Sequence, residues 1–252
     1  MLTGQTILIT GAGGLLGSQV TAAILAQGAK VIAADLSVAA MKTKFTELIE
    51  AHLDSLSLVA LDVTNEVDVK QFFLKQNELS GAVNCTYPRN AQYGTAFLDV
   101  SLDSFNENIS LHLGSSFLFM QQCAALFTRQ KTPMSVVNVS SIYGVVAPQF
   151  ALYEGTSMTM PIEYAAIKSA LLHLNKYVAA FVKDSRFRVN SISPGGIFDH
   201  QPNPFLEAYR QSTHGHGMLS PSDLTGSIIF LLSQQSQYVT GQNIIIDDGF
   251  TL

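Results

Sequence analysis

Short runs of β-branched and apolar residues alternate with helical patterns along the whole chain. Helical periodicity is clearest in Gly17–Gln27, Phe105–Phe127 and Glu163–Lys183. The runs that predict strands are Thr6–Thr10, Lys30–Ala34, Ser57–Leu61, Gly81–Asn84, Ser135–Val139, Arg188–Ile192 and Asn243–Ile246. Strands that alternate with helices form a parallel sheet covered on both faces, so we expect a doubly wound α/β fold of about seven strands.

The composition suits one large core. Of 252 residues, 47% are hydrophobic and only 13% are charged, and no repeat or polar linker divides them, so we expect residues 1–252 to form a single domain. Residues 145–162 and 197–220 are expected to be substrate loops. Within the second, Phe198–Leu219 carries Pro, Asn, Gly and three His and predicts a loop or lid.

Charge and processing signals exclude several classes of partner. The net charge is −5 and no Lys/Arg-rich run occurs, which argues against nucleic acid. No signal-peptide pattern and no apolar run long enough for a membrane span is present. Cys85 and Cys123 lie in apolar surroundings without metal-ligand spacing, which is typical of free thiols in a reducing compartment. We therefore expect a cytoplasmic protein.

A glycine-rich turn follows the first predicted strand, with Gly11, Gly14 and Gly17 around Leu15 and Leu16. Glycines let a backbone approach a pyrophosphate, and the helix that starts near Gly17 offers N–H donors and a positive dipole end. A plain tight turn between strand and helix is the alternative. The turn is therefore a candidate dinucleotide site.

Acidic residues end the second and third strands. Asp35, followed by Leu36, suits the ribose hydroxyls of NAD, and no Lys or Arg lies in the glycine turn or in Leu36-Ser37 to accept a 2′-phosphate, so NAD rather than NADP is predicted. Asp62, followed by Val63, could meet the adenine amino group. The alternative for Asp62 is a helix N-cap or a turn residue.

Tyr164 and Lys168 lie four residues apart in a helical pattern, so they share one helix face. A nearby ammonium favours the phenolate, so we expect a lowered pKa for Tyr164 and proton exchange near neutral pH. Hydride transfer needs such a proton movement at oxygen. Together with the glycine turn, the pair predicts a nicotinamide-dependent oxidoreductase.

With these motifs in place, the chain resembles the short-chain dehydrogenase/reductase family over essentially its whole length, which implies a Rossmann fold. A closer likeness is to bacterial oxidoreductases of flagellin modification and polysaccharide biosynthesis, carried by Ser141-Ile142-Tyr143-Gly144, Tyr153-Glu154-Gly155 and Met160–Tyr164. The motifs that match the family are the glycine turn, Asp35, Asp62, Asn84, Asn138–Ser141, Tyr164/Lys168, Arg188–Asn190, Pro194-Gly195 and Gly241-Gln242 with Asp247.

The resemblance implies a role for each matching residue. Ser141 would polarise the substrate oxygen, Tyr164 would be the general acid/base, and Lys168 would tune Tyr164 and bind the nicotinamide ribose. Asn84 would support the cofactor. The backbone after Pro194 and Gly195, around Ile197, would face the carboxamide. Ser140 is the alternative to Ser141, and a strand-end cap is the structural alternative for the pair. The family likeness and the low charge also predict a homotetramer or homodimer.

Four departures from the family pattern affect the site. Leu15 stands where a third glycine is usual, and the Gly11/Gly14/Gly17 spacing is similar to that of the longer sugar-nucleotide branch. His112 stands where the family has a helical Asn, so it is either a proton relay or a buried packing residue. Asp199 replaces a Thr that often meets the cofactor. Extra residues at Phe150–Pro161 predict a loop over the substrate, with polar groups suited to a polyol or sugar: Tyr153, Glu154, Thr156, Ser157 and Thr159.

These observations favour an NAD-dependent oxidoreductase for a secondary alcohol or ketone of a polar, sugar-derived small molecule. One alternative is a sugar-nucleotide epimerase or dehydratase with transient use of bound NAD. Another is a non-catalytic NAD-binding regulatory protein, which His112 keeps open. His200, His214 and His216 raise the possibility of zinc, but no carboxylate or Cys has a supporting spacing, so we expect no metal.

Overall fold

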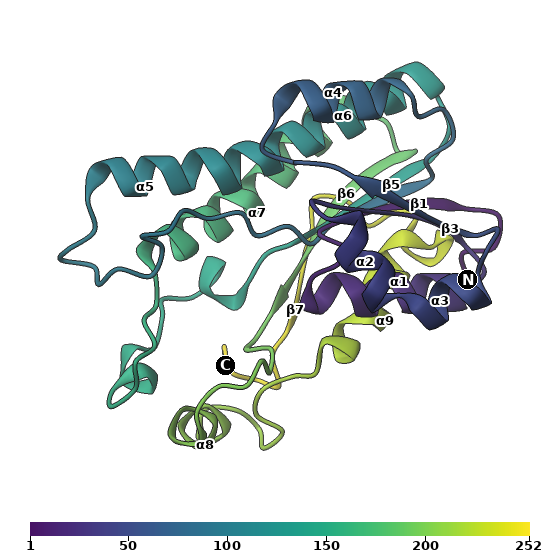
Figure 1. Ribbon diagram of the computed structural model, residues 1–252. Coiled ribbons are helices and arrows are strands. Elements are labelled where there is room, and N and C mark those ends of the chain that lie inside the picture. Colours follow the sequence, from purple (N-terminus) through teal and green to yellow (C-terminus); the bar gives the residue numbers. More distant parts are fainter.

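The computed structural model describes residues 1–252, and its centre is one seven-stranded parallel sheet (Figure 1). The strand order is β3-β2-β1-β4-β5-β6-β7, which confirms the expected doubly wound fold. The strands are β1 (Thr6–Thr10), β2 (Lys30–Asp35), β3 (Leu56–Ala60), β4 (Gly81–Asn84), β5 (Met134–Val139), β6 (Phe187–Pro194) and β7 (Asn243–Ile246).

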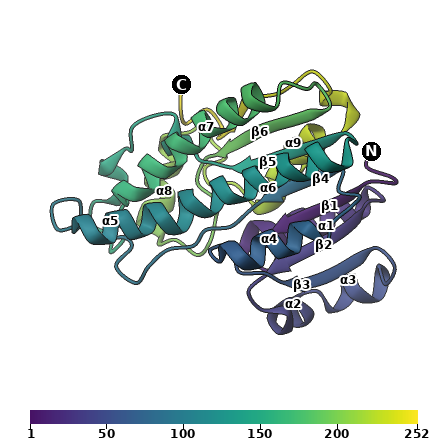
Figure 2. The same ribbon diagram turned by 90° about the horizontal axis from the view of Figure 1, so that it is seen from above.

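Helices cover both faces of this sheet, as the two views show (Figures 1 and 2). On one side lie α1 (Leu15–Ala26), α2 (Val38–Lys44), α3 (Thr46–Ala51) and α9 (Thr225–Leu232). On the other lie α4 (Glu66–Leu74), α5 (Leu102–Asn108), α6 (Ser115–Gln130) and α7 (Ile162–Val182). The helix α8 (Asn203–Gln211) stands away from the sheet in Figure 1. No helix is long and apolar enough to cross a membrane.

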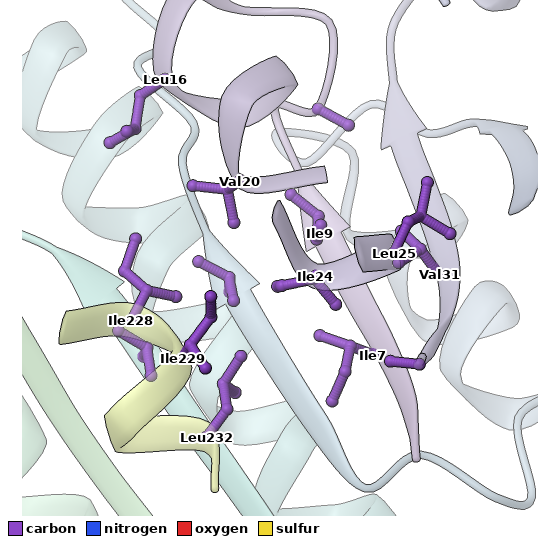
Figure 3. Close-up of a cluster of buried hydrophobic side chains, with 14 of the residues drawn as sticks. Ile7, Ile9, Leu16, Val20, Ile24, Leu25, Val31, Ile228, Ile229 and Leu232 are labelled. Atoms are coloured by element: carbon purple, nitrogen blue, oxygen red, sulfur yellow. The ribbon is translucent and has the colours of Figure 1, made fainter. Parts of the chain in front are cut away.

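Alternating side chains on the strands build two cores. Ile7 and Ile9 of β1 join α1 and α9 on one face, where Figure 3 shows them beside Val20 and Ile24. Leu8, between them, joins the core under α4, α6 and α7 on the other face. Each such side chain, when fully buried, contributes roughly 1.5–3 kcal/mol, which holds the strand ends in register.

The register places the functional ends of the strands together. Thr10 pairs with Asn84, and Asn84 pairs with Asn138, at the carboxyl ends of β1, β4 and β5. The chain order reverses between β1 and β4, because β2 and β3 lie on one side of β1 and β4 to β7 on the other. Parallel α/β sheets bind ligands at the carboxyl ends beside such a switch point.

Two segments differ from the expected pattern. The expected helix Phe105–Phe127 is part of a longer helical run, in which a π-helical segment, Ile109–Gly114, separates α5 from α6. The expectation of a loop for Phe198–Leu219 is wrong for its middle, which forms α8. This helix forms because Phe205 and Tyr209 lie four residues apart and pack together on Phe250 and Tyr143.

Candidate active site

A cavity of about 1010 Å³ runs along the carboxyl ends of the strands. Ser140 and the following predicted residues line it: Gly11, Gly14, Leu15, Leu16, Asp35, Leu36, Asp62, Val63, Ser141, Tyr164, Lys168, Pro194, Gly195 and Ile197. Gly17, Asn84 and His112 do not line it. The structure therefore joins the glycine turn, the acidic residues and the Tyr/Lys pair along one cavity.

The glycine turn has no room for side chains. Gly11 has φ +72, and a Cβ there would lie 2.8 Å from the carbonyl oxygen of Cys85. A Cβ on Gly17 would overlap the carbonyl oxygen of Gly11, so Gly17 serves close packing of α1 rather than contact with the cavity. Gly14 caps α1 without a side-chain hydrogen bond. This bare backbone at a helix N-terminus fits a pyrophosphate.

The Asp35 carboxylate is tied to the turn. Its oxygens accept hydrogen bonds from the backbone N–H of Gly13 at 2.9 Å and of Leu36 at 2.7 Å. A cation is also present, since Lys44 of α2 donates to the carbonyl oxygens of Gly13 and Gly14 at 3.0 and 3.2 Å. No Lys or Arg lies within the glycine turn or in Leu36-Ser37, but folding brings Lys44 to the turn from 30 residues away along the chain.

Asp62 and Asn84 have mainly structural contacts. Asp62 accepts from the backbone N–H and hydroxyl of Thr64, at 2.9 and 2.6 Å, so the turn-residue alternative describes its side chain, while Asn65 caps α4. The buried Asn84 accepts from Thr10 and Thr86, and its amide donates to Ser116. Asn84 thus links β1, β4 and α6 beneath the cavity rather than facing it.

The candidate proton-transfer residues come from two packed segments. A 3-10 turn, Ile142–Gly144, follows Ser141 and lies on α7 so closely that a Cβ on Gly144 would approach the backbone of Lys168 to 2.7 Å. Ser140 stabilises this packing, because its hydroxyl donates a hydrogen bond to the carbonyl oxygen of Lys168 at 2.9 Å. Ser141 stays beside Tyr164 and favours its phenolate. The geometry favours Ser141 over Ser140 as the serine that meets substrate.

Burial dominates the titration of Tyr164 and Lys168. Burial raises the pKa of Tyr164, although the Ser141 hydroxyl lowers it, so the expected lowering is not what the structure shows. Burial also lowers the pKa of Lys168 from 10.5 to about 7. Its Nζ donates to the carbonyl oxygen of Val139 at 2.8 Å and lies 5.5 Å from the Tyr164 ring centroid. Lys168 can therefore release or take a proton near neutral pH.

His112 contacts the lining residues Lys168 and Tyr87 but does not line the cavity itself. It sits buried in the π-helical segment, and its Nε2 lies 3.4 Å from Lys168 Nζ. Burial, and then the charge of Lys168, hold the pKa of His112 well below its usual value, so the ring is neutral. Its Nδ1 is buried without a hydrogen-bond partner. A π-segment and an unpaired polar atom are typical of functional positions.

Both expected substrate loops contribute residues to the cavity, and the first also contributes Met158 and Met160. Tyr153, Thr159 and Pro161 line the cavity, but Glu154, Thr156 and Ser157 do not. The hydroxyl of Thr156 donates to the carbonyl oxygen of Tyr153, so the expectation that Thr156 faces the substrate is wrong. Thr159 lines the cavity, although its hydroxyl donates to the carbonyl oxygen of Gly94. From the second loop come Asp199, Gln201, Phe205, Tyr209 and Met218. Tyr209 accepts a hydrogen bond from the backbone N–H of Gly196 and so fixes the loop after β6.

Sequence reasoning missed the segment after β4. Tyr87 packs edge-on against the rings of Tyr164 and His112, with centroids 5.6 and 5.1 Å apart. Arg89 lies over Tyr87 and also lines the cavity. Their place in the sequence could have indicated this, because residues directly after a strand at the switch point of a parallel sheet face the ligand site.

The three histidines considered for zinc lie in the chain segments on either side of α8. The backbone N–H of His214 and that of His216 both donate to Asp248, at 2.8 and 2.7 Å. His200 packs beside Phe198. No group of three or more His, Cys, Asp or Glu side chains converges on a possible metal position.

Comparison with known proteins gives consistent results. A family model described as enoyl-(acyl carrier protein) reductase matches residues 11–251. The post-translational flagellin modification protein A of Campylobacter coli is 35% identical over 257 residues, with 100% of both chains covered. A 2,5-dichloro-2,5-cyclohexadiene-1,4-diol dehydrogenase of Sphingobium indicum is 28% identical, with 99% and 98% covered. A solved short chain dehydrogenase from Leptospira borgpetersenii with bound NAD+ is 32% identical, with TM-score 0.87 and 100% and 94% covered.

Proposed function

The chain belongs to the short-chain dehydrogenase/reductase family, and we propose that it transfers a hydride between NAD and a secondary alcohol or ketone of a polar, sugar-derived substrate. The observation that carries this proposal is the convergence of Ser141, Tyr164 and Lys168 on a cavity that continues to the glycine turn and Asp35.

The residues present fit NAD. The glycine turn would offer backbone N–H groups to a pyrophosphate, Asp35 suits ribose hydroxyls, and Pro194, Gly195 and Ile197, which line the same cavity, would face the nicotinamide. When bound, NAD supplies the hydride chemistry. The relative with bound NAD+ supports this choice of cofactor.

Tyr164, Ser141 and Lys168 would carry out the proton transfer to or from the substrate oxygen. Tyr164, whose pKa burial raises, holds its phenolic proton at neutral pH and can donate it to a carbonyl oxygen. Ser141 gives that oxygen a second hydrogen bond. Lys168 has a pKa of about 7 and can restore the proton to Tyr164. In the oxidation direction the same groups accept a proton in the reverse order.

A sugar-derived substrate is supported by the flagellin-modification relative. We assign the protein to flagellin glycan or surface polysaccharide biosynthesis. The decisive experiment is an NADH absorbance assay with sugars, sugar phosphates and sugar nucleotides. Net NADH change with one of them supports the proposal, and product formation without NADH change supports an epimerase or dehydratase that recycles bound NAD.

Assembly is proposed from exposed aromatic side chains. Phe117 of α6 and Tyr177 and Phe181 of α7 are exposed, and Tyr177 and Phe181 stack with centroids 6.4 Å apart. Apolar helix faces of this kind are covered in symmetric oligomers, so we propose a homotetramer or homodimer. A cytoplasmic location remains our proposal, in agreement with the free thiols of Cys85 and Cys123.

A further inference from the structure

The segment after β4 is held rigidly beside the catalytic residues. The backbone N–H of Asn90 donates to Asn108 at 2.9 Å, and its side-chain amide donates to Ser104 and Glu107 of α5. Asn108 in turn donates to Asn90 and to the buried Glu163, the neighbour of Tyr164. These hydrogen bonds fix the backbone beside Arg89, the residue before Asn90.

That residue, Arg89, rests on aromatic rings. Its guanidinium carbon lies 4.9 Å from the ring centroid of Tyr87 and 6.0 Å from that of Tyr93. Tyr87 itself lies 5.6 Å, centroid to centroid, from Tyr164. The Tyr87 ring therefore contacts both the Arg89 guanidinium and the Tyr164 ring, and all three residues line the same cavity.

Arg89 has no anionic partner in the chain. None of the three ion pairs includes it, and its side chain donates no hydrogen bond. The carboxylate of Glu107 accepts from Asn90 instead. Among the residues that line the cavity, Arg89 and Lys168 are the only cations, and Lys168 is buried at the reaction centre. Arg89 is therefore the one cation free to bind a charged group at the substrate end.

We propose that Arg89 binds an anionic group of the substrate, a phosphate or a carboxylate, at a position remote from the reacting carbon. A guanidinium presents paired N–H donors that match either oxyanion, and the tyrosine rings hold its plane in position. Fixing this remote charge orients the alcohol carbon toward Tyr164. The proposal rests on the function proposed above and narrows its substrate class to acidic or phosphorylated sugars.

The test uses the NADH-loaded enzyme, in which an alcohol cannot be oxidised. Dissociation constants for glucose, glucose 6-phosphate and glucuronate are measured by NADH fluorescence at constant ionic strength. We expect at least one anion to bind about tenfold or more tightly than glucose. Arg89→Gln should remove this preference and Arg89→Lys should keep part of it. Lys75→Gln, which removes an exposed cation outside the cavity, should retain all of it.

The outcomes separate the possibilities. A preference for one anion identifies phosphate or carboxylate as the group, and equal binding of both shows that charge alone is recognised. Equal binding of glucose and the anions, no binding of any of the three, or a preference that survives Arg89→Gln overturns the inference. NADH formation from neutral sugars without an anion preference leaves the proposed function intact. Anion binding through Arg89 without any NADH change contradicts the proposed function alone.

Discussion

Replacing Lys168 with Met should stabilise the NAD-free protein while removing its activity. Burial lowers the pKa of Lys168 from 10.5 to about 7. At low pH the buried ammonium therefore destabilises the folded state. At about 1.4 kcal/mol for each pH unit between the two pKa values, the upper limit of this cost is ~5 kcal/mol. Loss of the bond to the Val139 carbonyl oxygen offsets ~1–3 kcal/mol, so we expect a net gain of ~2–4 kcal/mol at pH 6.

The effect of Lys168 on the free energy of unfolding depends on pH. Below pH 7 Lys168 is protonated in both the folded and the unfolded state, so the cost is fully present. Between about pH 7 and 10.5 the unfolded state binds more protons, so the native protein gains stability as pH rises. The native protein should therefore gain ~3 kcal/mol from this group between pH 6 and 9, and the advantage of Lys168→Met should shrink toward zero.

Urea unfolding at pH 6, 7.5 and 9, at one fixed protein concentration, measures both effects. Lys176→Met is the matched control, since Lys176 is an exposed lysine of the same helix, and its pH dependence should equal that of the native protein. A Lys168→Met variant that is less stable at pH 6, with the native pH dependence unchanged, would refute the reasoning.

Four further predictions follow from the site and the surface. Tyr164→Phe should reduce kcat by ~10²–10⁴-fold and leave NAD affinity nearly unchanged, because only the proton-transferring hydroxyl is lost; native turnover in steady-state assays would contradict the assignment. If His112 relays protons for Lys168, His112→Asn should keep measurable turnover and His112→Leu should not; equal turnover per folded enzyme, with different melting temperatures, would make it a packing residue. NAD should bind much more tightly than NADP, and Asp35→Ala should narrow that preference in calorimetric titrations, because it removes the carboxylate that would repel a 2′-phosphate; equal native affinities would exclude the role of Asp35. Phe181→Glu should lower the mass measured by light scattering, because it charges an apolar helix face, and a native monomer at micromolar concentration would contradict the proposed assembly.

Features encoded in neighbouring residues were predictable from the sequence. Short runs of β-branched and apolar residues located all seven strands, with ends within two residues, and the glycine turn appeared where a strand meets a helix. The four-residue spacing of Tyr164 and Lys168 places both on one face of α7. Parallel pairing then brings the carboxyl ends of the strands together, so Ser141, Asp35 and the glycines converge without further information.

Only the tertiary structure decided the surroundings of these residues. Lys44 reaches the glycine turn across 30 residues of chain, and Asn84 bonds to Thr10 and Ser116. Arg89 comes to lie over Tyr87, which packs against Tyr164. The sign of the pKa change at Tyr164 also depended on burial, which outweighs its neighbours. Backbone periodicity is a local property, whereas desolvation and contacts between distant segments exist only once the whole chain has packed.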